Sequence, residues 1–116
     1  MDFNYTFEEK DSVGIINLSG SLMENNQVAG LIEEVENRVL QESNKFIVCM
    51  DNLKYMNSTG LNVLISILTK SRRSGGDVVI CCVPKKVQEL LLITKLNTVF
   101  TITDNLENAL EVFKEN

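Results

Sequence analysis

The organisation of this chain is clearest in residues 45–64, KFIVCMDNLKYMNSTGLNVL. Residues 45–50 are almost continuously apolar, which is typical of a β-strand that is covered on both faces. After a polar patch at residues 56–60, apolar side chains return at helical spacing in Leu61, Leu64, Ile65 and Leu68. The stretch therefore predicts a buried strand, a short polar connection and an amphipathic helix.

The residues on either side of this stretch extend the same pattern. Upstream, residues 5–9 and 13–18 are two extended runs joined by a polar link, which predicts a hairpin. A helix is predicted next, because apolar residues recur at helical spacing in Val28, Leu31, Ile32, Val35 and Val39. Downstream, Gly75 and Gly76 predict the end of the central helix.

Two further strands and two further helices are predicted in the last third of the chain. Residues 77–83 have the composition of another buried strand, and Pro84 suits the first turn of the helix that follows. Residues 99–103 are predicted to form a short strand. The last helix is indicated by apolar spacing at Leu106, Ala109, Leu110 and Phe113. Asp104 or Asn105 is available to cap it.

The predicted order of elements is β-β-α-β-α-β-α-β-α. A helix between successive later strands requires those strands to pair in parallel through right-handed crossovers, whereas the first hairpin adds an antiparallel strand at one edge. No repeat or linker interrupts residues 1–116. We therefore predict a single α/β domain with a mixed, mostly parallel sheet of about five strands and four helices.

Composition excludes several classes of function. The net charge of −5 and the pI of about 4.7 argue against a direct nucleic-acid partner, which requires clustered cations. The chain has no histidine, so the usual general base and the usual zinc ligand are absent. The first residues lack the features of a secretory signal, and no apolar run approaches the length of about 20 residues that spans a membrane. We expect a cytoplasmic protein that is neither an enzyme nor inserted in a membrane, and that needs no cofactor or metal.

Three cysteines, Cys49, Cys81 and Cys82, fit the reduced thiols of a cytoplasmic chain. Cys81 and Cys82 are neighbours, so in a strand their side chains would point to opposite faces. A redox pair is one interpretation of them, but burial as small apolar side chains is the interpretation that we favour, and Cys49 in mid-strand is interpreted in the same way.

The polar patch before the central helix holds the candidate site. In the simpler interpretation, Asn57 or Ser58 caps the helix by accepting a backbone N–H. However, the patch has more capping groups than one helix needs, namely the side-chain amide of Asn57 and the hydroxyls of Ser58 and Thr59. Gly60 is a poor helix former, so its position in the first turn indicates that another part of the molecule lies close to the backbone there. The patch also follows a central parallel strand at its carboxyl end, where open α/β sheets present functional groups.

Residues 51–64, DNLKYMNSTGLNVL, resemble the signature of the anti-sigma factor antagonists, which are bacterial STAS-domain proteins. In that signature a strand and a short loop lead into Asp-Ser-Ser/Thr-Gly-Leu at the start of a helix. The resemblance extends over almost the whole chain. It includes the Leu-x-Gly turn in residues 18–22, the Gly-Gly before the strand at 78–82, and the helix and closing strand in residues 90–100.

The resemblance implies a partner switch. It implies that Ser58 is phosphorylated by a kinase that is also the anti-sigma factor. The unphosphorylated antagonist would capture this kinase and release the sigma factor, and a PP2C-type phosphatase would reverse the modification. One difference from the family pattern is Asn57, which stands where the family usually has Asp.

From these residues we expect Ser58 to be a substrate, since no histidine can activate it as a nucleophile. A phosphate at a helix N-terminus should leave the fold intact. The partner surface is expected to include Asn57, Ser58, Thr59 and Gly60 together with the exposed helix side that carries Asn62, Ser66 and Thr69. The alternative is a non-switching STAS subunit of a transporter-associated or stress-signalling complex. We expect a monomer, and the sequence leaves higher oligomers open.

Overall fold

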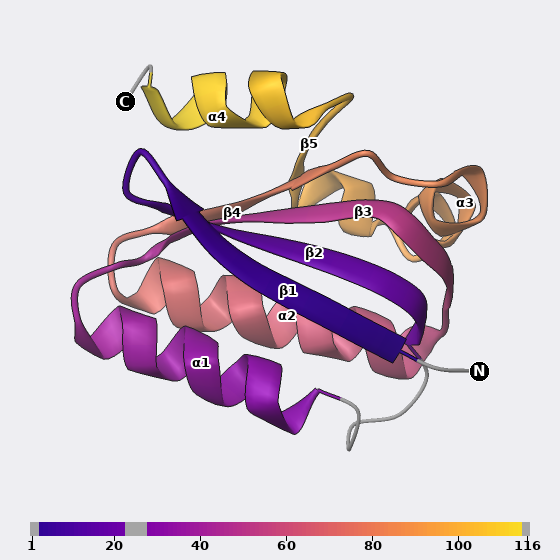
Figure 1. Ribbon diagram of the computed structural model, residues 1–116. Coiled ribbons are helices and arrows are strands. Elements are labelled where there is room, and N and C mark those ends of the chain that lie inside the picture. Colours follow the sequence, from indigo (N-terminus) through magenta and orange to yellow (C-terminus); the bar gives the residue numbers. More distant parts are fainter. Residues whose placement is uncertain (1–2, 23–27, 115–116) are drawn as a thin grey trace.

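A computed structural model describes residues 3–22 and 28–114 of the chain. Figure 1 shows one sheet with helices on both faces. The elements in chain order are β1 (Phe3–Lys10), β2 (Val13–Leu22), α1 (Ala29–Leu40), β3 (Lys45–Met56), α2 (Ser58–Arg73), β4 (Asp77–Cys81), α3 (Lys85–Ile93), the 3-10 turn η2 (Leu96–Thr98), β5 (Thr101–Thr103) and α4 (Leu106–Lys114). The predicted order of strands and helices is confirmed.

The five strands lie in the sheet in the order in which they occur in the chain, β1-β2-β3-β4-β5. β1 pairs antiparallel with β2 through the predicted hairpin, and every later pairing is parallel. Each parallel strand therefore ends at the same edge of the sheet, and the start of α2 lies at that edge because it follows β3 directly.

The two faces of the sheet are covered unequally. Figure 1 shows α1 and α2 side by side across one face and α4 alone on the other. The larger apolar cluster lies on the α1–α2 face and includes Phe46, Val48 and Met50 of β3. The smaller cluster lies beneath α4 and contains Val13, Ile15, Ile47, Cys49, Val79, Cys81, Ala109, Leu110 and Phe113. Alternate residues of the central strands thus enter different cores, as expected for strands buried on both sides.

Several boundaries differ from the prediction. β3 continues from residue 50 to Met56, because its second half pairs with Ser19–Leu22 of β2 through two irregularities in register. This pairing depends on the register between the strands, which local sequence does not specify. β4 ends at Cys81, and Cys82 has a positive φ of 58°, so the expected pair of strand neighbours on opposite faces is not formed.

The end of the chain also differs in detail. Pro84 is the N-cap of α3 instead of a residue of its first turn. Val99 and Phe100 were predicted as strand, but their amides donate to the carbonyl of Leu96, so they close η2 and β5 begins at Thr101. Of the two candidate caps of α4, Asn105 is used: its Oδ1 accepts the backbone N–H of Asn108 at 2.8 Å.

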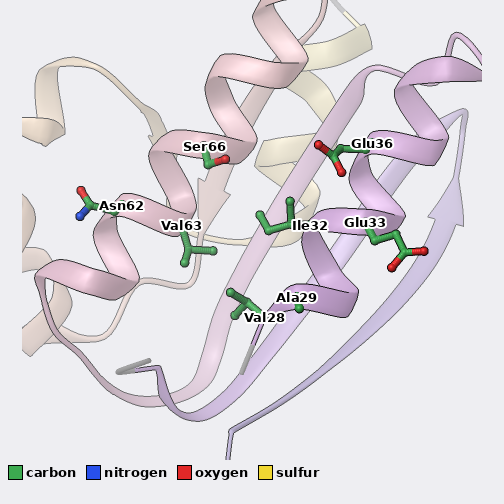
Figure 2. Close-up of a pocket in the computed structure, with 8 residues that line it drawn as sticks. All are labelled: Val28, Ala29, Ile32, Glu33, Glu36, Asn62, Val63 and Ser66. Carbon is green, nitrogen blue, oxygen red and sulfur yellow. The ribbon is translucent and has the colours of Figure 1, made fainter. Parts of the chain in front are cut away.

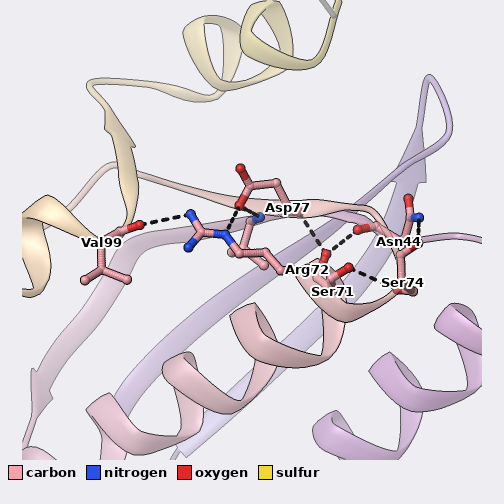
Figure 3. A network of polar contacts seen from close by, with 7 residues as sticks. Asn44, Ser71, Arg72, Ser74, Asp77 and Val99 are labelled. Carbon is pink, nitrogen blue, oxygen red and sulfur yellow. Dashed lines mark hydrogen bonds and ion pairs between the residues drawn. The ribbon is translucent and has the colours of Figure 1, made fainter.

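A polar network fastens the far end of α2 to the sheet (Figure 3). The hydroxyl of Ser71, a fully buried residue, lies within hydrogen-bonding reach of the backbone carbonyls of Asn44 and Asp77, just before β3 and at the start of β4. Arg72 adds an ion pair to Asp77 at 3.1 Å and a hydrogen bond to the carbonyl of Val99 at 3.0 Å. The network holds the C-terminal end of α2 in place against the sheet. Because α2 is one continuous helix, this also constrains the orientation of its N-terminal end.

Gly76 lies where this network meets the backbone, and it should be hard to replace. A Cβ at this position would collide with the carbonyl group of Asn44 and lie 2.7 Å from the Asn44 Cβ. We expect Gly76→Ala to lower the free energy of unfolding by about 2–3 kcal/mol, because backbone cannot move aside as a side-chain tip can. Urea denaturation measures this loss.

Gly75→Asn is the matched control. Gly75 has a φ of 88°, which asparagine adopts more readily than other residues, and a Cβ there would be 3.9 Å from its nearest neighbour. We expect a loss below about 1 kcal/mol for this variant. If both variants lost the same free energy of unfolding, the Asn44 backbone would not be what constrains residue 76.

Candidate functional site

Ser58 lies at the start of α2 with an exposed side chain. The cap of the helix is supplied by its neighbour Asn57, whose Oδ1 accepts the backbone N–H of Gly60 at 3.1 Å. Of the two candidate caps, the structure therefore assigns Asn57. The Ser58 hydroxyl makes no hydrogen bond with any residue in 3–22 or 28–114, so its oxygen is available at the surface.

Gly60 is buried and explains the close approach that the sequence indicated. A Cβ on Gly60 would lie 2.8 Å from the carbonyl oxygen of Leu22 and would collide with the side chain of Met56. The backbone of α2 thus rests directly on the ends of β2 and β3. The close neighbours of Gly60 belong to this chain, and its contribution to the site is to set the position of Ser58.

The remaining candidate residues follow one side of α2. Asn62 and Thr69 are exposed and Ser66 is half-buried. Their spacing from Ser58 of four, eight and eleven residues places all four on one side of the helix. Thr59 is half-buried and lies beside this line. Apart from the buried Gly60, the residues predicted to contact a partner therefore form a continuous strip from Asn57 to Thr69.

A groove between α1 and α2 borders this strip, and the sequence did not indicate it. Figure 2 shows Asn62 and Ser66 on one wall and Glu33 and Glu36 on the other. Val28, Ala29, Ile32 and Val63 complete the lining. The periodicity of each helix was visible in the sequence, but the groove exists only because the two helices pack side by side.

The electrostatic setting of Ser58 comes from the helix. α2 has no acidic residue in its first turn, and its last turn carries Lys70, Arg72 and Arg73. The partial positive charge of the N-terminus is therefore not neutralised locally, and the free N–H groups of the first turn favour a negative group there.

No side chain in residues 3–22 or 28–114 hydrogen bonds to the Ser58 hydroxyl in this structure. Across the same residues there is no cluster of three or more side chains suited to holding a metal ion. None of the described helices has the length and apolar content needed to cross a bilayer.

Two substitutions at Asn57 separate capping from charge. Asn57→Ala should destabilise the protein by about 1 kcal/mol, because the Gly60 amide loses its acceptor. Asn57→Asp keeps the acceptor and adds a negative charge at the N-terminus, so the protein should be as stable as wild type or more stable by a few tenths of a kcal/mol. Thermal unfolding measures both effects. A loss with Asn57→Asp as large as that with Asn57→Ala would contradict the assigned cap.

Comparisons with known proteins agree with the geometry. An anti-sigma F factor antagonist from Paenibacillus polymyxa is 27% identical over 112 residues, which cover 95% of this chain and 94% of that protein. The structure of an anti-sigma factor antagonist from Mycobacterium paratuberculosis superposes with a TM-score of 0.81 at 17% identity and covers 96% of this chain and 93% of that one.

SpoIIAA of Bacillus, solved in its phosphorylated form, has a TM-score of 0.75 at 14% identity, with 95% of this chain and 99% of that one covered. At these identities the solved structures support the fold. The family model of the STAS domain matches residues 4–109, which is nearly all of the chain. The chain therefore belongs to the STAS-domain family.

Proposed function

We propose that this protein is an anti-sigma factor antagonist controlled by phosphorylation of Ser58. In its unphosphorylated form it binds an anti-sigma factor that is also a serine kinase, and the sigma factor is released. The observation that carries the proposal is the exposed, unengaged Ser58 hydroxyl beside a helix cap that Asn57 already provides. The names of its relatives support the same function.

In this proposal Ser58 is the substrate of another protein. Because no side chain among the described residues hydrogen bonds to the hydroxyl, the base and the ATP come from the kinase. A PP2C-type phosphatase would return the protein to its binding form. In this proposal the protein acts in the cytoplasm on protein partners, as a monomer, and without direct contact with nucleic acid.

Phosphorylation at this position should change recognition without changing the fold. A phosphate adds a charge of roughly −1.5 to −2, which the N-terminus of α2 favours. Ser58 is exposed, so the added group extends into solvent and displaces no core residue. The added charge therefore acts on the partner, whose surface would meet the strip of Asn57, Ser58, Thr59, Asn62, Ser66 and Thr69. Gly60, which was also expected on this surface, is buried and serves only to position Ser58.

The size of the effect is sufficient for a switch. A partner surface that fits a neutral hydroxyl would have to desolvate the phosphate or place it against like charge, at a cost of several kcal/mol. Since each 1.4 kcal/mol is a factor of ten, a cost of about 3–4 kcal/mol weakens capture by roughly 10²–10³.

Intact-mass measurement after incubation with the kinase and ATP tests the modification. The kinase is the protein that co-purifies from the native cell with immobilised unphosphorylated chain. We expect one phosphate on wild type and on Thr59→Val, and none on Ser58→Ala, because Ser58 alone is proposed as the acceptor. Phosphate on Ser58→Ala would move the site to another residue.

A wild-type chain that binds its partner but gains no phosphate would instead favour a non-switching STAS subunit of a transporter-associated or stress-signalling complex. Asn57 is the observation that favours this second function, because it stands where the family motif has Asp.

Binding measurements test the electrostatic mechanism separately. Ser58→Asp should bind the same kinase at least tenfold more weakly than wild type, whereas Ser58→Ala should retain affinity, because only the former adds charge. Thermal unfolding of Ser58→Asp should match wild type or be slightly higher, since the charge is at a helix N-terminus. Equal affinity of wild type and Ser58→Asp, with both folded, would exclude the charge mechanism.

A further inference from the structure

Two buried thiols face each other across the centre of the sheet. Cys49 of β3 and Cys81 of β4 are direct partners in the parallel register. Their sulfur atoms are 3.2 Å apart and share a hydrogen bond, and neither is in a disulfide. The sequence suggested only the neighbours Cys81 and Cys82 as a pair, whereas the structure pairs Cys81 with a residue 32 positions away.

The strand geometry permits a covalent bond between these two residues. Neighbouring strands lie about 4.7–4.9 Å apart. This spacing falls within the Cα separation of roughly 4.4–6.8 Å that disulfides span. The sulfur atoms already point toward each other, so closure requires a small approach of the two strands and no change of register.

The pair lies in the cluster beneath α4, close to the point where the buried part of this face of β3 ends. Cys49 and Cys81 belong to that cluster together with Ile47 and Val79, two residues earlier on the same strands. One step further along the same face of β3, Asp51 is exposed, and Asn17, the partner of Cys49 on β2, is half-buried. Solvent therefore approaches the pair from the side of Cys49, which is 6% exposed, while Cys81 is 0% exposed.

The shared hydrogen bond distinguishes the two thiols chemically. Either thiol can donate in this hydrogen bond. Donation from Cys81 stabilises the thiolate of Cys49, which lowers the pKa of Cys49 against the opposing effects of its burial and of Glu8 and Asp51. The same hydrogen bond and burial raise the pKa of Cys81. The thiol with the lower pKa is thus also the one nearer to solvent, and thiolate character with access governs reactivity toward oxidants.

We propose that Cys49 and Cys81 form a peroxide-sensitive modification site that closes into a reversible cross-strand disulfide. The Cys49 thiolate attacks one oxygen of hydrogen peroxide, the O–O bond breaks, and the departing hydroxide takes up a proton to become water. Cys81 then attacks the sulfenic sulfur of Cys49, and the S–O bond breaks to release a second water. Two thiols are oxidised by two electrons and one peroxide is reduced to two waters.

Cys82 is the internal control for this proposal. It is the most accessible of the three thiols, but it lies beyond the end of β4, with a φ of 58°. It is not a register partner of Cys49. If oxidation followed exposure alone, Cys82 would react first; if it follows the pairing of thiols, Cys49 and Cys81 react together and Cys82 stays reduced.

The experiment treats the purified full-length chain with hydrogen peroxide under native conditions, followed by thiol counting and non-reducing peptide mapping. We expect titratable thiols to fall from the three present to one, with a peptide linked between Cys49 and Cys81, and full recovery after dithiothreitol. Cys82→Ser should form the same bridge. Cys81→Ser should form none and should leave a sulfenic acid on Cys49 that dimedone traps.

Three results would overturn the proposal. The first is a bridge between Cys81 and Cys82 or between two chains. The second is oxidation confined to Cys82. The third is retention of all three thiols at peroxide concentrations that oxidise a free cysteine added to the same sample. None of these results bears on phosphorylation of Ser58, so the two proposals stand or fall separately.

Discussion

The close contact of Gly60 with the carbonyl of Leu22 and the side chain of Met56 is the constraint on which the rest of the site depends. It brings the start of α2 against the ends of β2 and β3, where a residue with a Cβ would not fit. The backbone N–H of Asn57 donates to the same Leu22 carbonyl. This carbonyl therefore contacts both the residue that precedes α2 and the first turn of α2.

Stability and recognition are divided between adjacent residues at this point. Asn57 satisfies an N–H of the first turn, and Gly60 makes the buried contact. Ser58 takes part in neither interaction, so its hydroxyl is free to be changed without loss of either. At the other end of α2, Ser71 and Arg72 bind the helix to the beginnings of β3 and β4 and to Val99. A helix fixed at both ends presents its exposed side in one orientation, which is what a docking surface requires.

The unequal covering of the sheet gives its two faces different chemistry. The face under α1 and α2 is a large apolar core, and the groove between those helices adjoins the proposed partner surface. Among the described helices, α4 alone covers the opposite face. Cys49 and Cys81 lie at the edge of the cluster beneath α4, one step along this face of β3 from the exposed Asp51. A residue pair at such an edge is held by packing and is still approachable by a small oxidant. The modification proposed for the thiols and that proposed for Ser58 therefore belong to different regions of one small domain.

Three features were predictable from local sequence: the order of elements, the edge hairpin and the position of Ser58 at a helix start. Local sequence patterns predict these features: apolar periodicity, the glycines after α2 and the polar patch before it. The same local signals predicted one domain, and its family resemblance is confirmed by the match to the STAS model. Local signals were also enough to foresee that something approaches Gly60 closely.

Tertiary structure alone decided what depends on register and on packing between distant segments. The extension of β3 to Met56 follows from pairing with the end of β2, and the early end of β4 follows from the turn at Cys82. The choice of Asn57 over Ser58 as the cap depended on backbone geometry. The Cys49–Cys81 pair and the α1–α2 groove join residues far apart in the chain. No periodicity within one segment specifies which residue of the next segment it will face, because that is fixed only when the whole sheet has formed.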